Sequence, residues 1–242
     1  MTILRPKSLL GDTSRAKAGL TLAACVIVVA VAGLSFKGQT APDSFDNAVD
    51  SPVISFLRGH GDLLTWLVVP GTLIPAVTIS AAIAAGCLIA RRLNGAVLAA
   101  VVVPAATGLN DGVLKHLFHR TYLGALSFPS GHTACVTGIA ATLAILLLVP
   151  PQQERTRRIR WVLVAVACLI AAVVAMGVIG LRWHYFTDTV AGGAVGVGTA
   201  LALALLLDLG TGIVSRPRRG NGALNLADEP AAKRRTRAAP AE

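Results

Sequence analysis

Residues 161–181 read WVLVAVACLIAAVVAMGVIGL, a run of 21 residues without a single charge. A transmembrane helix needs roughly 18 or more apolar residues in succession, so this run is long enough to cross a bilayer. The chain carries five more runs of this kind, at residues 18–36, 63–90, 93–110, 133–151 and 189–207. Because lipid offers no partners to backbone polar groups, such runs form helices. The sequence therefore predicts an all-α, polytopic membrane bundle of about six transmembrane helices.

Two of these runs carry details that refine the prediction. The run at 63–90 contains Pro70 and Pro75, so we expect it to be kinked or to begin as a segment at the membrane interface. The run at 93–110 is expected to continue past its last residue, toward Leu117.

The composition excludes several classes of protein. Of the 242 residues, 54% are hydrophobic and only 14% are charged, against about 25% charged in a typical soluble domain. This excludes a soluble globular enzyme, a disordered chain and a secreted disulfide scaffold. The four Cys stand singly within apolar runs, with no CxxC pair, so we expect neither disulfides nor zinc ligation.

Basic residues gather on alternate sides of the predicted spans. If the N-terminus is cytoplasmic, all but five of the 22 Lys and Arg residues fall in cytoplasmic segments. Because cytoplasmic loops are rich in Lys and Arg, we expect a multi-pass protein of the cell membrane with both termini cytoplasmic. The net charge of +10 is then explained by membrane topology and membrane lipids, and no nucleic acid partner is expected. The five exceptions are Lys37, Arg58, Lys115, Arg120 and Arg182.

The chain divides into three parts. Residues 1–17 form a cytoplasmic N-terminal tail, and residues 18–209 form the six-helix membrane domain. Residues 210–242 form a basic cytoplasmic tail that we expect to be disordered. A cleaved signal peptide is the alternative for the first span, with cleavage near Thr40–Ala41. The oligomeric state is not determined by the sequence.

Six polar residues stand at the outer ends of the third to sixth spans. They are Lys115, Arg120, His132, Arg182, His184 and Asp188. Ionisable residues at membrane depth are energetically costly and often mark a functional site. We therefore expect these residues to form one polar pocket that opens toward the outer side.

The residues that open the fourth span are typical of an anion site. Residues 128–133 read FPSGHT, and Pro suits the start of a helix. Ser130 and Gly131 leave backbone N–H groups exposed at the positive end of the helix dipole, which predicts phosphate binding. His132 is placed to donate a proton to a leaving group. An ordinary N-cap turn with an interfacial His is the alternative.

His184 and Asp188 are four residues apart, which places them on one face of a helix. A carboxylate bonded to one imidazole nitrogen makes the other a better base or nucleophile; a surface His–Asp pair is the alternative. Lys115 and Arg120, near the end of the third span, are suited to hold phosphate oxygens, unless they only extend to the interface. Asp111 lies four residues before Lys115 and either orients or neutralises it.

The acidic residues near the expected pocket are few. Only Asp111 and Asp188 are placed there, whereas hard metals such as Mg²⁺ prefer several carboxylates and waters. The cations already supply the positive charge that a phosphate needs. The sequence therefore predicts a site without metal or cofactor.

Residues 107–198 resemble the type-2 phosphatidic acid phosphatase superfamily of lipid phosphate phosphatases and haloperoxidases, in its bacterial membrane branch. The family has three motifs: a Lys with a downstream Arg-Pro, then Pro-Ser-Gly-His, then Ser-Arg followed by His and Asp. Residues 129–132 match the second motif completely. Lys115 matches the start of the first motif, and His184 and Asp188 keep the spacing of the third.

Two arginines of the family pattern are missing. The position seven residues after the family's Lys is Tyr122, and Arg120 lies two residues earlier, without a following Pro. The position six residues before the family's His is Val178. If the helix continues, Arg182 lies one turn further on the same face and replaces the missing guanidinium.

The resemblance implies a mechanism and a role for each matching residue. His184 attacks phosphorus to form a phosphohistidine, Asp188 orients His184, and His132 protonates the leaving oxygen. The phosphoryl oxygens are held by Lys115, Arg120, Ser130, Gly131 and Arg182. A pocket at the outer edge of the bilayer favours a lipid phosphate or isoprenoid diphosphate as the substrate of this membrane phosphatase domain.

Other functions stay open because of the missing arginines. A catalytically weakened protein that binds a lipid phosphate is one, and a lipid phosphotransferase, which passes the phosphoryl group to an alcohol, is another. A transporter or channel requires a continuous polar path, and the inner halves of the spans are uniformly apolar. A haloperoxidase fits least well, because those enzymes are typically soluble. The sequence does not name the lipid.

Overall fold

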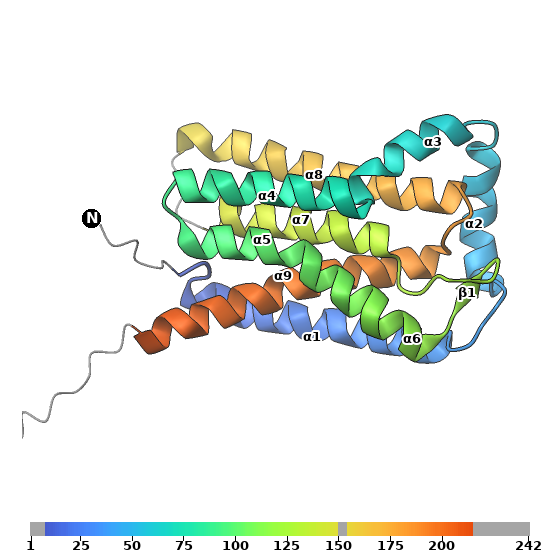
Figure 1. Ribbon diagram of the computed structural model, residues 1–242, viewed down its shortest axis with the longest axis horizontal. Helices are drawn as coiled ribbons and strands as arrows, with labels where there is room; N and C mark the ends of the chain where they lie inside the picture. The colour runs from blue at the N-terminus through green and yellow to red at the C-terminus, as the bar shows by residue number, and fades with distance from the viewer. Residues whose placement is uncertain (1–7, 150–153, 215–242) are drawn as a thin grey trace, which may run out of the picture.

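The computed structural model of the chain describes residues 8–149 and 154–214. Six helices run along the long axis of the molecule and form a bundle (Figure 1). They are α1 (Asp12–Ser35), α4 (Leu73–Ile89), α5 (Leu93–Leu109), α7 (Gly131–Leu148), α8 (Glu154–Gly180) and α9 (Phe186–Val214). The expected all-α membrane bundle is confirmed.

One of the spans is bent in its middle. In the described part of the chain, five helical stretches are long and apolar enough to cross a membrane alone, and a bent pair brings the number to six. The pair joins α3 (Gly61–Val68) and the 3-10 turn η1 (Val69–Gly71) to α4 through a 44° change of direction. Pro70 and Pro75 stand on either side of the bend, where their missing N–H groups disfavour a continuous helix. The expected kink is therefore present.

Several spans, α1 among them, are longer than their apolar runs. The 93–110 run continues through a π-helical turn, η2 (Asn110–Leu114), and α6 (Lys115–Phe118). The helix α8 begins at Glu154, so the basic residues before its apolar run are helical as well, and long basic side chains can keep their charges in water. The helix α9 reaches Val214, so the first residues of the expected disordered tail are helical. The rest of that tail and residues 1–7 lie outside the described residues.

Short elements cover the end of the bundle that lies away from the first and last described residues (Figure 1). They are α2 (Ser44–Phe56), β1 (Thr121–Tyr122) and β2 (Ala125–Leu126), the two strands forming an antiparallel hairpin. The helix α2 lies between the first two predicted spans, within residues 37–62. Asp43 caps it by accepting the N–H of Asp46 at 2.7 Å, a common way for a helix to begin.

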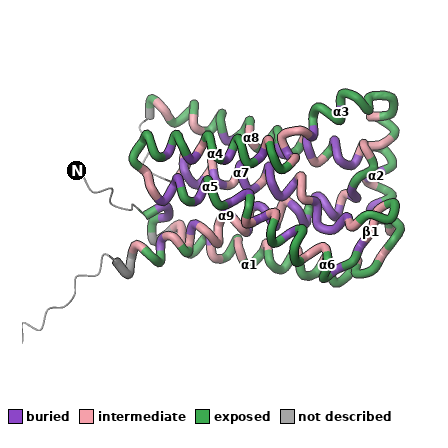
Figure 2. Tube along the Cα trace, viewed as in Figure 1, coloured by how far each residue is buried: buried purple, intermediate pink, exposed green. Residues whose placement is uncertain are grey.

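The helix α7 forms the centre of the bundle, where it packs against α5, α8 and α9. Figure 2 shows buried residues in the middle of the bundle and exposed residues along its outer faces. Two glycines bring α9 against α7: a Cβ on Gly192 would lie 2.3 Å from the Ser130 carbonyl oxygen, and one on Gly196 would lie 2.3 Å from that of Ala134. Large apolar side chains such as Ile89, 86% exposed, face outward, as lipid contact requires.

The first span is an integral part of the bundle. The helix α1 packs along α9, and Asp208 near the end of α9 binds the residues that precede α1. Its carboxylate accepts the N–H groups of Leu9 at 2.6 Å and Leu10 at 2.8 Å, and the hydroxyl of Ser8 at 2.8 Å. The first and last described residues therefore lie at one end of the bundle (Figure 1).

Candidate active site

The turn before α7 is held in place by α9. Ser130 is the N-cap of α7: its hydroxyl accepts the Thr133 N–H at 3.4 Å, and its own N–H donates to the Asp188 carbonyl at 3.0 Å. In the first turn of α7, the N–H groups of Gly131 and His132 have no acceptor among the described residues. Two open donors at the positive end of a helix dipole form a site for an anion.

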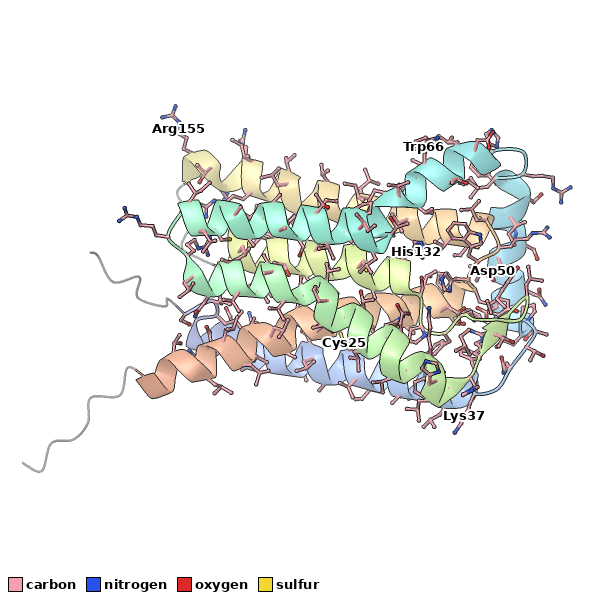
Figure 3. All side chains as sticks on the ribbon, viewed as in Figure 1. Cys25, Lys37, Asp50, Trp66, His132 and Arg155 are labelled. Atoms are coloured by element: carbon pink, nitrogen blue, oxygen red, sulfur yellow. The ribbon has the colours of Figure 1, made fainter. Side chains whose placement is uncertain are left out.

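His132 and His184 line the same cavity, which has a volume of about 400 Å³. Their ring centroids are 6.2 Å apart. Figure 3 shows His132 within the bundle, toward the end at which Asp50 lies. Other lining residues that bear on the chemistry are Thr72, Thr107, Asp111, Lys115, Gly131 and Trp183. The structure thus brings together residues from α4, α5, η2, α6, α7 and the turn before α9.

His184 lies directly ahead of α9 and is only 7% exposed. Its Nδ1 is 3.7 Å from Oδ2 of Asp188, beyond hydrogen-bond distance, and has no hydrogen-bond partner among the described residues. Catalytic hydrogen bonds often reach their full geometry only when substrate binds. Asp188 is completely buried, and its Oδ2 also accepts the Tyr185 N–H at 3.1 Å. Because Nδ1 is the nitrogen nearest Asp188, Nε2 is the nitrogen left for chemistry.

Lys115 is the only Lys or Arg among the described residues that line the cavity. Its ammonium group is 2.8 Å from the carboxylate of Asp111, and the two side chains are 20% and 47% exposed. Asn110 fixes this carboxylate, because its amide donates to Asp111 and to the Pro129 carbonyl at 3.1 Å each. A Cβ on Gly131 would lie 3.6 Å from the Asp111 Oδ1. The carboxylate therefore lies beside the start of α7 and offsets the only fixed cation of the cavity.

Arg120, which the sequence predicted to hold phosphate, does not line the cavity. It is completely buried, and its Nη1 donates to Oδ1 of Asp188 at 2.7 Å. Its Nη2 donates to Asp46, and its guanidinium lies 4.4 Å from the ring centroids of both Phe36 and Tyr185. In this structure Arg120 binds the carboxylate of Asp188, which lies beside His184, and does not reach the cavity that His184 lines.

Arg182 also lies outside the cavity lining. The helix α8 ends at Gly180, and Arg182 has a left-handed backbone with φ 58° and an exposed side chain. Since the helix does not continue, Arg182 does not share a face with Val178, which is completely buried. The prediction that Arg182 replaces the family's arginine from the same helix face as Val178 is therefore wrong. The family's other missing arginine corresponds to Tyr122. The ring of Tyr122 packs on that of Tyr185, with 4.4 Å between the ring centroids, and burial raises the pKa of the Tyr122 hydroxyl.

Two buried carboxylates of α2 belong to the site and were missed by the sequence reasoning. Asp46, completely buried, accepts the Thr187 N–H and hydroxyl at 3.0 Å each. Asp50, 5% exposed, accepts the Phe186 N–H at 3.1 Å, and burial together with the charge of Asp46 raises its pKa to about 7. Asp43, Asp46 and Asp50 are spaced three and four residues apart, as on one face of a helix. This spacing is the local pattern in the sequence that indicates α2.

The starts of α7 and α9 therefore differ in what they offer a ligand. The first N–H groups of α9 are occupied by carboxylates of α2, whereas those of α7 are open beside the cavity. Within residues 8–149 and 154–214, no three His, Cys, Asp or Glu side chains come together as metal ligands. An anion with its charge on oxygen is the ligand that these groups suit best.

Comparisons with known proteins show what the chain is similar to. The family model described as the PAP2 superfamily matches residues 104–209, a range that contains His132, His184 and Asp188 but not α2. A search of curated proteins found no significant match. Among solved structures, the chain is similar to the first transmembrane PAP2 type phosphatidylglycerolphosphate phosphatase from Bacillus subtilis. The two are 20% identical, with a TM-score of 0.60, and the alignment covers 82% of this chain and 99% of that one.

Proposed function

Because the chain belongs to the type-2 phosphatidic acid phosphatase (PAP2) superfamily, we propose that it is an integral-membrane phosphatase. Its substrate in this proposal is a lipid phosphate or an isoprenoid diphosphate, hydrolysed without a metal through a phosphohistidine. The observation that carries the proposal is that His184 and His132 line one cavity beside the open N–H groups that begin α7.

In the first step, Nε2 of His184 attacks phosphorus, and the bond from phosphorus to the leaving oxygen breaks. Asp188, next to Nδ1, stabilises the positive charge that the imidazole acquires. Protonated His132 gives its proton to the leaving oxygen, so that the lipid departs as an alcohol or as a lipid monophosphate. Lys115 and the N–H groups of Gly131 and His132 bind the other phosphoryl oxygens, whose charge grows in the transition state.

In the second step, water attacks the phosphohistidine. Neutral His132 takes a proton from the water while the bond between nitrogen and phosphorus breaks. Phosphate leaves, His184 is neutral again, and His132 is protonated for the next cycle. Ser130 contributes to both steps by capping α7 and binding the start of α9 through its N–H, which keeps the two histidines at their spacing.

The position of the cavity supports a lipid substrate. Thr72 and Leu73 line it at the bend between η1 and α4, and the apolar side chain of Leu73 is 52% exposed. A lipid can therefore keep its chain in the bilayer while its phosphate enters the cavity. The structural relative is itself described as a phosphatidylglycerolphosphate phosphatase, which also supports a lipid phosphate.

We further propose that the cavity faces the outer side and that both termini are cytoplasmic. Figure 3 shows Arg155 at the end of the bundle opposite Asp50. The loop residues Arg91 and Arg92 connect α4 to α5 at this same end, where the first described residues also lie (Figure 1). Because Lys and Arg gather on the cytoplasmic side, this end is the inner one.

One observation favours a second candidate, a weakened protein that binds lipid phosphate. Lys115 is paired with Asp111, and Tyr122 and Val178 stand at the two positions where the family pattern has arginine. Fewer cations mean less stabilisation of the charge that develops in the transition state. A phosphotransferase shares the first step and differs only in using an alcohol in place of water.

Phosphate release from purified protein in detergent, with EDTA present, tests the proposal. The panel is phosphatidate, phosphatidylglycerophosphate and a polyprenyl diphosphate, each with and without an added alcohol. Release from at least one lipid is expected. Transfer to the alcohol without release would identify a phosphotransferase, and lipid binding without either product would identify the weakened binding protein.

A further inference from the structure

We propose that Asp46 of α2 is a positioning residue that acts through Arg120 on the pair formed by His184 and Asp188. This inference rests on the proposed function. Asp46 touches neither the cavity nor a histidine. It binds the guanidinium that binds Asp188, and Asp188 in turn lies against His184. The charge of Asp46 sets how strongly Arg120 holds Asp188, and therefore how much of that carboxylate's charge acts on His184.

The contacts form one continuous chain of buried charges. Arg120, Asp46 and Asp188 are each completely buried, so water screens none of their interactions. Arg120 donates to Asp46 with Nη2 and to Asp188 with Nη1. A guanidinium confined between two carboxylates divides its attraction between them, and removing one leaves the whole cation to the other.

Asp46 is also fixed firmly enough to do this. Its Oδ1 accepts the Thr187 N–H and its Oδ2 accepts the Thr187 hydroxyl, at 3.0 Å each. The hydroxyl also accepts from Arg120 Nη1 at 2.6 Å, so Thr187 joins both ends of the network. The neighbouring residue Asp188 thus has a backbone that Asp46 helps to hold and a side chain whose charge Asp46 helps to balance.

The sign of the effect follows from this geometry. A carboxylate beside an imidazole favours its protonated form and strengthens the nitrogen as a nucleophile. If Asp46 loses its charge, Arg120 neutralises Asp188 more fully, and His184 holds a proton less tightly. The groups facing this pair from every packed element are His132 on α7, Lys115 and Asp111 on α6 and η2, Arg120 before β1, Tyr185 before α9, and Asp46 and Asp50 on α2. Of these groups, only Asp46 and Arg120 are changed in the variants that test the proposal.

The test measures kcat, KM and the pH–rate profile of Asp46→Asn on the lipid that the wild type hydrolyses fastest. Asn keeps an oxygen that accepts the Thr187 N–H while removing the charge. We expect kcat to fall on the order of 10-fold, as for other partners that orient a functional side chain, with KM within about twofold. The acid limb of the profile, where His184 loses its proton, should move to lower pH. The matched control is Asp62→Asn, the same change at an exposed position of α3.

The double variant Asp46→Asn with Arg120→Gln separates positioning from simple support of the fold. Removing both charges leaves Asp188 without a cation, so the acid limb should return to or above the wild-type pH. A merely structural role predicts no such return, because the double variant loses more contacts than the single one. If Asp46→Asn does not fold, the double variant is compared with the wild type, and an acid limb below that of the wild type overturns the inference. An unmoved limb in Asp46→Asn overturns it as well, whereas an inactive wild type contradicts the proposed function itself.

Discussion

Asp111 is the residue at which the electrostatics of the cavity can be tested most simply. Its carboxylate lies 2.8 Å from the ammonium group of Lys115, the one fixed cation that lines the described cavity. A phosphate bound to Lys115 meets this carboxylate as a like charge. Asp111→Asn keeps the shape and removes the charge, so the variant should bind a lipid phosphate more tightly.

The size of the effect follows from the distances. A phosphate oxygen in contact with Lys115 lies about 4 Å from the Asp111 oxygens, where two unit charges interact by about 1 kcal/mol in water and about 4 kcal/mol near a protein surface. The Asp111 side chain is 47% exposed, and solvent screening places the interaction near the lower limit. A loss of repulsion of about 1 to 2 kcal/mol corresponds to a change of about 5- to 30-fold.

The assay is steady-state phosphate release in detergent over a range of lipid concentrations. We expect KM for Asp111→Asn to fall about 5- to 30-fold at low salt, and the difference should shrink as salt screens the charges. Asp62→Asn, which removes an equal charge at an exposed position of α3, should leave KM within about twofold. An unchanged or higher KM in Asp111→Asn would show that the carboxylate orients Lys115 and does not weaken binding of the substrate by repelling its phosphate.

Two further predictions concern stability and packing. Since the pKa of Asp50 is raised to about 7 from 3.8, the folded protein loses stability as pH rises from about 4 to about 7, and Asp50→Asn removes this loss. The melting temperature of the variant should therefore exceed that of the wild type by more at pH 8 than at pH 5; an equal difference at both would contradict the assignment. Gly192→Ala places a Cβ 2.3 Å from the Ser130 carbonyl, so α9 must move from α7, with a loss of stability of about 1 to 3 kcal/mol and of most phosphate release. Gly19→Ala, with nothing within 4 Å of the new Cβ, is the control, and equal behaviour of the two variants would show that the close approach of the helices is unimportant.

The spans and the grouping of the histidines could be predicted from the sequence for physical reasons. Uncharged runs of bilayer length permit few structures other than helices, and the prolines at 70 and 75 indicated the bend that the structure contains. The turn before α7 and the His184–Asp188 spacing are local patterns, so the chain itself determines their geometry. The cavity that unites them required only that four helix ends meet at one end of the bundle.

The arginines could not be placed from the sequence, because their positions depend on contacts between distant segments. Arg120 is only five residues from Lys115, yet it points to carboxylates on α2 and α9, 74 and 68 residues away. Arg182 was assigned to a continuing helix, whereas α8 ends at Gly180. The role of Asp46 depended on the same long-range pairing, and no local pattern revealed that its carboxylate meets a buried guanidinium.

Trapping the intermediate is the most direct test of His184 as the nucleophile. Purified wild type and His184→Ala are mixed in EDTA with phosphatidate that is radiolabelled in its phosphate. The reactions are quenched after less than one turnover, and the protein is separated from lipid under alkaline conditions that preserve phosphohistidine. We expect label on the wild-type protein, lost on mild acid treatment, and none on His184→Ala. Label on His184→Ala, or phosphate release by that variant at the wild-type rate, would show that His184 is not the nucleophile.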